Sequence, residues 1–192
     1  MKQIDAIVNA CIEKGYVTSE KAPWLYYALE KRITSVAIFI PLCAIGLLLT
    51  NAATLLSFYI TFYFLRSLTN GWHAKTFLRC YICSIVGEVV FLGVLIDFWN
   101  PVLARISTLI ASILIWILAP FNDPNIGLTV DETDECKRIV KRRLVLLMIS
   151  ITTLRFMGGA HLACGAELGI LMTALTLLLA YTKRIWGRFF FR

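Results

Sequence analysis

The feature that most constrains the fold is a series of long apolar runs separated by short polar segments. Six such runs follow one another, and four of them contain no charged residue. The runs cover residues 33–50, 52–65, 80–96, 106–119, 144–159 and 168–182. A transmembrane helix needs about 20 predominantly apolar residues, so runs of this length predict membrane-spanning helices. The composition agrees, because charged residues make up 16% of the chain, whereas a soluble domain has roughly 25%.

These runs predict an all-α integral membrane protein with about six transmembrane helices, preceded by N-terminal amphipathic helices. In the N-terminal segment, residues 1–31, apolar side chains that include Ile4 and Val8 recur at the spacing of one helix face. Gly15 is expected to end this first helix, and a second helix is expected to begin at Ala22-Pro23. In the alternative with four spans, the weaker runs lie in the membrane interface.

We interpret the chain as one membrane domain, residues 1–192. After the amphipathic segment come a transmembrane bundle at 33–182 and a basic tail at 183–192. Lys and Arg gather at alternate connections between the runs, and the positive-inside rule then places both termini in the cytoplasm. Arg105 is the one residue that departs from this pattern. Membrane topology therefore explains the net charge of +7, and no nucleic-acid partner is expected.

One polar segment, residues 66–80, interrupts the apolar runs on the predicted cytoplasmic side and holds His73 and Cys80. A cysteine thiolate is a nucleophile, and a neighbouring imidazole can take the proton of the thiol. In one continuous helix, seven residues would separate the two side chains by about 10.5 Å along the axis. We therefore expect Asn70 and Gly71 to form a turn, with His73 on a bent entry and Cys80 near the start of the third span.

These residues also have structural interpretations. A cysteine at the edge of a span commonly packs against apolar neighbours, and a histidine at the interface can be a simple polar anchor. Cys83 is a competing nucleophile three residues after Cys80. Arg66 could hold a substrate carboxylate through two parallel hydrogen bonds, or it could anchor its helix at the cytoplasmic surface.

Glu88 is an ionisable residue inside an apolar run, which makes it a candidate functional residue. It could orient His73, but we expect it to pair with Arg155 in the fifth run. His161 falls on the predicted outer side and is assigned a structural role. The two histidines and the scattered cysteines match no metal-site spacing, so we expect no metal and no other cofactor.

Two further groups of residues could contact a substrate. Pro120 and Asn125 belong to a proline-rich break after the fourth run, which could shape a groove but is better explained as a helix stop. Lys137 and Lys141 belong to a basic cluster that follows an acidic loop. This cluster could set topology alone, or it could attract an acidic peptide or anionic lipid.

The pattern Arg66-x4-Gly71-x-His73-Ala-Lys-x4-Cys80, followed by an apolar run and by Ala119-Pro-x3-Pro-Asn, resembles the AgrB family. These are accessory gene regulator membrane proteases of Gram-positive quorum sensing. The resemblance extends to chain length, the amphipathic start, the clustered spans and the basic cytoplasmic connections.

The resemblance implies a cysteine endopeptidase of the cell membrane, with Cys80 as nucleophile and His73 as general base at the cytoplasmic face. The implied reaction removes the acidic C-terminal tail of an AgrD-like propeptide and leaves an acyl-enzyme thioester. A Cys or Ser of the propeptide then attacks this thioester, which closes a thiolactone or lactone ring. Arg66 and Gly71 match family positions and are assigned supporting roles in charge contact and in a backbone turn. The resemblance also implies a homodimer.

This chain departs from the family pattern in the placement of its basic residues. Some members carry a lysine run directly after the proline break, whereas here the basic residues begin at Lys137. The substrate-binding candidates are therefore Pro120, Asn125, Lys137 and Lys141, with Glu88 in a supporting role. The alternative function is a non-proteolytic membrane transporter or scaffold for the same peptide.

Overall fold

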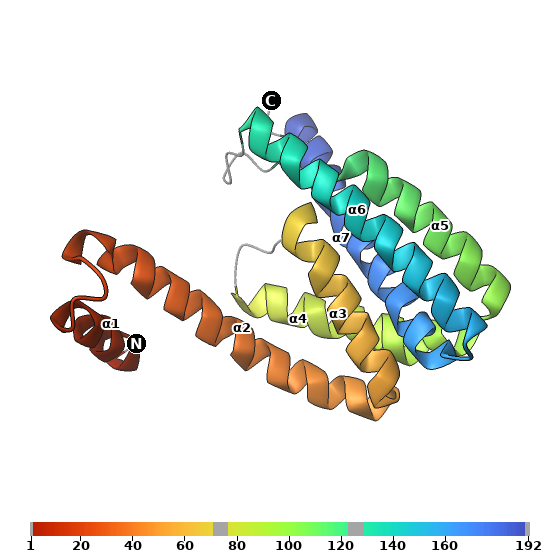
Figure 1. Ribbon diagram of the computed structural model, residues 1–192, viewed down its shortest axis with the longest axis horizontal. Helices are drawn as coiled ribbons and strands as arrows, with labels where there is room; N and C mark the ends of the chain where they lie inside the picture. Colours follow the sequence, from red (N-terminus) through yellow and green to blue (C-terminus); the bar gives the residue numbers. More distant parts are fainter. Residues whose placement is uncertain (1, 71–76, 123–128, 191–192) are drawn as a thin grey trace. The chain divides into compact units, whose positions relative to one another are not determined.

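The computed structural model describes residues 2–70, 77–122 and 129–190, and these residues form helices without strands (Figure 1). The chain divides into two compact units, Met1–Ala44 and Ile45–Arg192. The predicted all-helical fold is confirmed. His73, Gly71 and Asn125 lie outside the described residues.

The first unit contains α1 (Lys2–Glu13), the short 3-10 helix η1 (Ser19–Lys21) and most of α2 (Ala22–Leu49). Ile4 and Val8 lie one turn apart on α1 and are both buried, as the apolar spacing predicts. Gly15 follows α1 with a φ of 72°, a left-handed conformation that glycine adopts without steric cost. The two predicted N-terminal helices are therefore confirmed.

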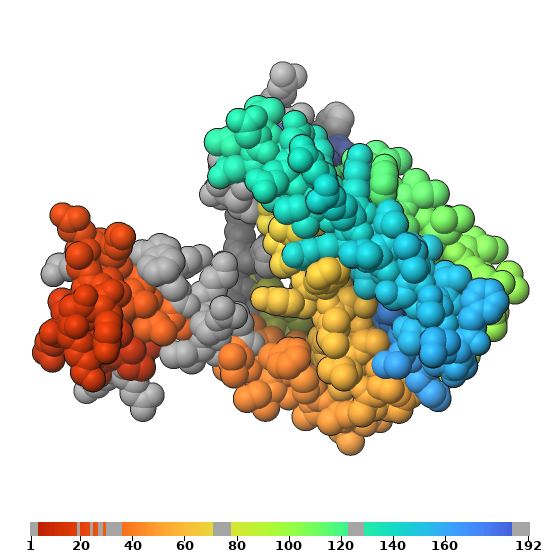
Figure 2. Space-filling model, in the orientation of Figure 1, coloured from red at the N-terminus to blue at the C-terminus, as the bar shows by residue number. Residues whose placement is uncertain are grey.

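In the second unit, α3 (Ala52–Thr69), α5 (Pro101–Leu118), α6 (Val130–Phe156) and α7 (Ala160–Phe190) form a packed bundle (Figure 1). The helix α7 contacts each of the other three. The side chains of α3, α6 and α5 lie side by side on the face shown in Figure 2. Burial of Ile115, Ile170 and Leu177 builds the apolar core between them.

Capping residues fix where three of these helices begin. Asn51 accepts a hydrogen bond from the backbone N–H of Thr54, and Asn100 accepts two at the start of α5. Thr129 and Glu132 form a reciprocal capping box at the start of α6. Hydrogen bonds donated by the backbone and hydroxyl of Thr129 hold the pKa of the exposed Glu132 carboxyl below its usual value.

The remaining helix changes its winding along its length. The α-helix α4 (Phe77–Glu88) continues as a π-helix, η2 (Val89–Val94), and ends as a 3-10 helix, η3 (Leu95–Phe98). Such π segments are frequent at functional sites. Cys80 is the fourth residue of α4, so it lies near the start of this helix, as expected.

Three of the described helical segments are long and apolar enough to cross a membrane: Leu78–Phe98, Pro101–Leu118 and Ala160–Ile185. Val36–Leu49 is a shorter apolar helix. The helix α6 begins at Val130, well before the predicted apolar run at 144, so its first half carries the basic cluster. The six-span arrangement stays a prediction.

Small residues bring α7 directly against α3. Gly165 and Gly169 are four residues apart and face the backbone of α3. A side chain at Gly165 would collide with the Thr54 carbonyl, and a Cβ at Gly169 would lie 2.8 Å from the Phe58 carbonyl oxygen. This spacing of small residues allows close helix packing, which helices in a membrane need because hydrophobic attraction between them is weak.

A charged network joins three helical segments inside the second unit. The Arg155 guanidinium donates to both oxygens of the buried Glu167 carboxylate, with a shortest distance of 2.6 Å. The Trp99 indole also donates to Glu167, at 2.9 Å. The predicted pairing of Arg155 with Glu88 is therefore wrong. The predicted sixth run begins at residue 168, but α7 begins at Ala160, so Glu167 lies two turns inside the helix.

Gly169→Val is expected to lower the free energy of unfolding by about 1–3 kcal/mol, because the backbone of α3 cannot move aside for the new side chain. Thermal unfolding of the purified chain in detergent measures this. Ala160→Val, at the exposed first residue of α7, is the control and should leave the midpoint unchanged. Equal midpoints for the two variants would contradict the close-packing argument.

Glu167→Leu is expected to cost about 3–5 kcal/mol of unfolding free energy, because it leaves the Arg155 charge without its carboxylate. The double variant Arg155→Leu/Glu167→Leu should recover much of this loss, because no uncompensated charge then remains. Denaturant titrations of the single and double variants measure both effects. If the double variant were as unstable as Glu167→Leu, the unpaired Arg155 charge would not be the cause of the lost stability.

Candidate active site around Cys80

Cys80 lines a cavity of about 800 Å³ in the second unit, between α3, α4, η2 and α7. Most of the wall is apolar, with Phe62, Phe91 and Leu179 among its residues. The polar side chains that interrupt this wall are Arg66, Cys80, Cys83, Ser84, Thr176, Thr182 and Lys183. A largely apolar cavity with a few converging polar groups is the usual form of a binding site.

The first turns of α4 present two thiols to this cavity. Cys80 is half-buried and Cys83, one turn later, is exposed. The Ser84 hydroxyl donates to the Cys80 carbonyl oxygen at 2.9 Å, a contact within α4 that involves the Cys80 backbone and not its thiol. Both cysteines therefore remain candidate nucleophiles on position alone.

Arg66 supplies positive charge beside Cys80. It lies near the C-terminal end of α3, and its guanidinium donates to the carbonyl oxygen of Asn70 at the end of that helix. Burial disfavours the charge of the guanidinium, whereas its electrostatic interaction with Cys80 favours that charge. Arg66 therefore places positive charge on the wall of the cavity that Cys80 also lines.

Lys183 is a cavity residue that the sequence analysis did not single out. The predicted sixth run ends at residue 182, so Lys183 was assigned to a basic tail. The helix α7 instead continues to Phe190, which carries Lys183 along the cavity wall. A basic residue at the end of an apolar run can anchor the helix at the membrane surface or face a binding site. The sequence pattern is the same in both cases, so it did not identify Lys183 as a cavity residue.

Glu88 lies deep in the second unit but is not part of the cavity wall. It is buried, and the Tyr59 hydroxyl donates to its carboxyl Oε1 at 2.7 Å. Its Oε2 has no hydrogen-bond partner among the described residues. The contact ties α4 to α3 at the point where α4 gives way to the π-helix η2. Glu88 is therefore placed to position the helix that carries Cys80.

Gly87 sets how closely α4 approaches α7 at the inner part of the cavity. A side chain at Gly87 would meet the Cε atom of Met172 on α7. Both residues line the cavity. The absence of a side chain at this one position allows α4 to close one side of the cavity while its first turns stand clear of α7.

The other predicted substrate-binding residues lie elsewhere. Pro120 follows the end of α5 and is buried, so the predicted helix stop is confirmed. On α6, Lys137 pairs with Asp134 at 3.0 Å, and the Lys141 ammonium lies 4.8 Å from the centre of the Trp116 ring. None of these three residues lines the Cys80 cavity.

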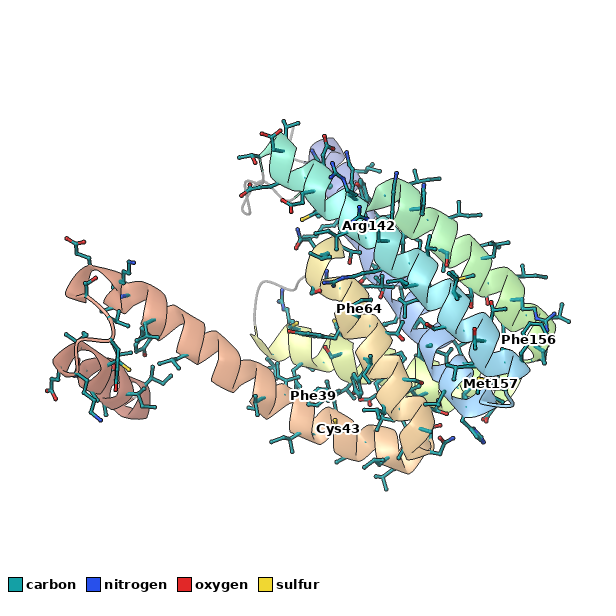
Figure 3. The ribbon with its side chains drawn as sticks, in the orientation of Figure 1. Phe39, Cys43, Phe64, Arg142, Phe156 and Met157 are labelled. Atoms are coloured by element: carbon teal, nitrogen blue, oxygen red, sulfur yellow. The ribbon has the colours of Figure 1, made fainter. Side chains whose placement is uncertain are left out.

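Arg143, from the same basic cluster, holds the end of α3 that carries Arg66. Its guanidinium donates to the Phe64 carbonyl and, at 3.0 Å, to the Ser67 hydroxyl. It also lies 4.3 Å from the centre of the Phe64 ring, which Figure 3 labels on α3. A cationic side chain stacked on a ring and bound to a carbonyl fixes two helices together. This part of the cluster has a structural role.

The described part of the site therefore combines a thiol, a nearby cation, a second cation and an apolar wall. This combination suits nucleophilic attack by a thiol on a carbonyl group of a ligand that carries negative charge. Within the described residues, no group of three or more His, Cys, Asp or Glu side chains could hold a metal ion.

Replacement of Arg66 with Gln should slow alkylation of Cys80 by the anionic reagent iodoacetate several-fold more than alkylation by neutral iodoacetamide, because it removes positive charge from the cavity wall. Both rates are measured at neutral pH in a Cys83→Ser background, with the labelled residue identified by peptide mass spectrometry. Arg66→Lys is the control and should keep most of the wild-type rate. Equal iodoacetate alkylation rates for wild type and Arg66→Gln would contradict an electrostatic role of Arg66 at Cys80.

Comparison with known proteins agrees with the sequence pattern. The family model described as Accessory gene regulator B, AgrB, matches residues 4–178, which is nearly the whole chain. No curated protein and no solved structure matches it. The matched region includes the whole cavity wall except for the last residues of α7 that reach it.

Proposed function

Because the chain belongs to the AgrB family, we propose that it is a membrane-embedded cysteine endopeptidase that removes the C-terminal tail of an AgrD-like propeptide. Membership in this family indicates a role in autoinducer peptide processing for quorum sensing, and the long apolar helices indicate a membrane protein. The observation that carries the proposal is the position of Cys80 in an apolar cavity beside the cationic Arg66.

In the proposed reaction, the Cys80 sulfur attacks the scissile carbonyl carbon of the propeptide while His73 accepts the thiol proton. The C–N bond then breaks, and His73 returns the proton to the departing amine of the tail. A thioester now links Cys80 to the remaining peptide. An internal Cys thiol or Ser hydroxyl attacks this thioester, which closes a thiolactone or lactone ring and releases the Cys80 sulfur. Gly71 is assigned the backbone turn that lets His73 reach Cys80.

The cavity wall favours ring closure over hydrolysis. Apolar side chains such as Phe62 and Leu179 limit the water that can reach the thioester, so the tethered nucleophile of the peptide competes well. Arg66 and Lys183 provide positive charge for the acidic part of the substrate. Asn125, Lys137 and Lys141 are assigned to tail residues beyond the cavity, where the acidic tail would replace the present contacts of the two lysines with Asp134 and Trp116.

We further propose that the chain has about six spans, with its termini and Cys80 on the cytoplasmic side of the cell membrane. The distribution of Lys and Arg supports this orientation. A homodimer is proposed from the family resemblance. The second candidate function is a transporter or scaffold for the same peptide, which the buried ionisable residues Glu88 and Glu167 support.

The test is mass spectrometry of a synthetic AgrD-like propeptide with an acidic tail, incubated with the purified chain in liposomes. Wild type should release the tail and show a transient adduct on Cys80. Cys80→Ala and His73→Ala should lower the cleavage rate by at least about a thousandfold, because each removes part of a nucleophile–base pair.

Cys83→Ala is the matched control, because it removes a thiol from the same helix and the same cavity. It should cleave at a rate close to that of wild type. If Cys80→Ala cleaved the propeptide and Cys83→Ala did not, the nucleophile would be Cys83 and not Cys80. Binding of the propeptide without cleavage by wild type would favour the transporter or scaffold.

A further inference from the structure

A second cavity, of about 430 Å³, lies between α5, α6 and α7 in the same unit. Arg105 and Thr108 reach it from α5, Arg155 from α6 and Glu167 from α7. Glu167 precedes Lys183, a residue of the Cys80 cavity, by 16 positions on α7. At 1.5 Å per residue these positions are about 24 Å apart, although the Cys80 cavity extends along α7 as far as Met172, five residues after Glu167. The two cavities share no lining residue.

This second cavity carries an excess positive charge. Glu167 neutralises Arg155 through the ion pair at 2.6 Å. Arg105 forms no ion pair with any of the described residues and is exposed. Two arginines and one glutamate therefore leave a net charge of +1 on the wall. A ligand that matches this wall carries one negative charge.

A buried hydroxyl in the same cavity also lacks a partner. Thr108 is 2% exposed, and its Oγ1 makes no hydrogen bond within the described part of the chain. Its neighbour Ser107 behaves as helical hydroxyls usually do and donates to the Leu103 carbonyl oxygen at 2.6 Å. A buried polar atom without a partner is costly. Thr108 follows Arg105 by three residues, which places the two side chains on one face of α5.

The position of this cavity along the bundle indicates where its ligand comes from. Arg105 is the fifth residue of α5, about 6 Å from the start of that helix, and Arg155 precedes the last residue of α6. Phe156 and Met157, labelled in Figure 3 at this end of α6, are 88% and 80% exposed. Arg105 lies near the start of α5, which is long and apolar enough to cross a membrane, and the exposed Phe156 lines the same cavity. A cation beside an apolar side chain near the end of a span matches the depth of lipid phosphate groups.

We propose that this cavity binds the phosphodiester headgroup of an anionic phospholipid. Arg105 and the Thr108 hydroxyl donate to the phosphate oxygens, and Leu109 and Phe156 contact the adjoining acyl chain. Arg155 stays paired with Glu167, so the phosphate meets the single surplus charge. The site accounts for Arg105, the basic residue that departs from the topology pattern.

The experiment uses the full chain in detergent with phosphatidylglycerol, and native mass spectrometry measures the lipid retained at each lipid concentration. Arg105→Gln should weaken retention about tenfold, because it removes a charge-assisted hydrogen bond. Thr108→Val should weaken it several-fold. Arg105→Lys should retain the lipid nearly as well as wild type. Arg142→Gln is the matched control, because Arg142 is an exposed arginine near the middle of α6, away from the cavity (Figure 3).

Thermal unfolding keeps folding defects separate from lost binding. Without lipid, Thr108→Val should be at least as stable as wild type, because it removes an unpaired buried hydroxyl. With phosphatidylglycerol, wild type should gain stability, and Thr108→Val and Arg105→Gln should gain much less. Equal gains in all proteins would overturn the proposal.

Two comparison ligands identify the source of the negative charge. Zwitterionic phosphatidylcholine should be retained at least several-fold less than phosphatidylglycerol, and equal retention would overturn the proposal. Glycerol phosphate, at the same concentration, should neither stabilise the chain nor displace the lipid. Stabilisation by glycerol phosphate that equals the effect of the lipid would assign the cavity to a free anion and overturn the lipid site.

Discussion

The close contact between α3 and α7 is the constraint on which the second unit depends. Gly165 and Gly169 let the two backbones approach until side chains on either would collide. Hydrophobic attraction contributes little to the association of helices in a bilayer, so close packing of small residues must supply the stability. Because α3 carries Arg66 and α7 carries Lys183, this contact also sets the width of the Cys80 cavity between them.

Polar contacts add directional restraints to this packing. Tyr59 and Glu88 join α3 to α4, Arg143 joins α6 to the end of α3, and Asn51 donates to the Nδ1 atom of His161 at the start of α7. Each contact lies at a helix end or at the change of winding after Glu88. At helix ends some backbone N–H and C=O groups have no partner within the helix. Side-chain contacts at these points therefore restrain the position of the helix end, which the regular backbone hydrogen bonds do not.

The all-helical fold could be predicted from the sequence because each apolar run falls largely within helical structure. The helix limits could not, because α6 and α7 begin well before their runs and the run at 80–96 is divided among α4, η2 and η3. The sequence predicted the pairing of buried charges poorly. Glu167 directly precedes the predicted run at 168–182, so the run alone did not place this residue inside a helix. The structure starts α7 at Ala160 and turns Glu167 inward to Arg155. Which of two acidic residues meets an arginine depends on helix rotation and register, which tertiary packing decides and local pattern does not.

The same limit applies to the basic residues, which look alike in the sequence but differ in what surrounds them. Arg155 is neutralised by Glu167, and Arg143 is held by a carbonyl and an aromatic ring. A cation held in this way would have to give up its partner before it could bind a ligand. Among the described residues, Lys183 and Arg105 have no such partner, and each lines a different cavity. The positive charge available to ligands is therefore divided between two cavities, with Lys183 of α7 on the wall of the larger one and Arg105 of α5 on the wall of the smaller one.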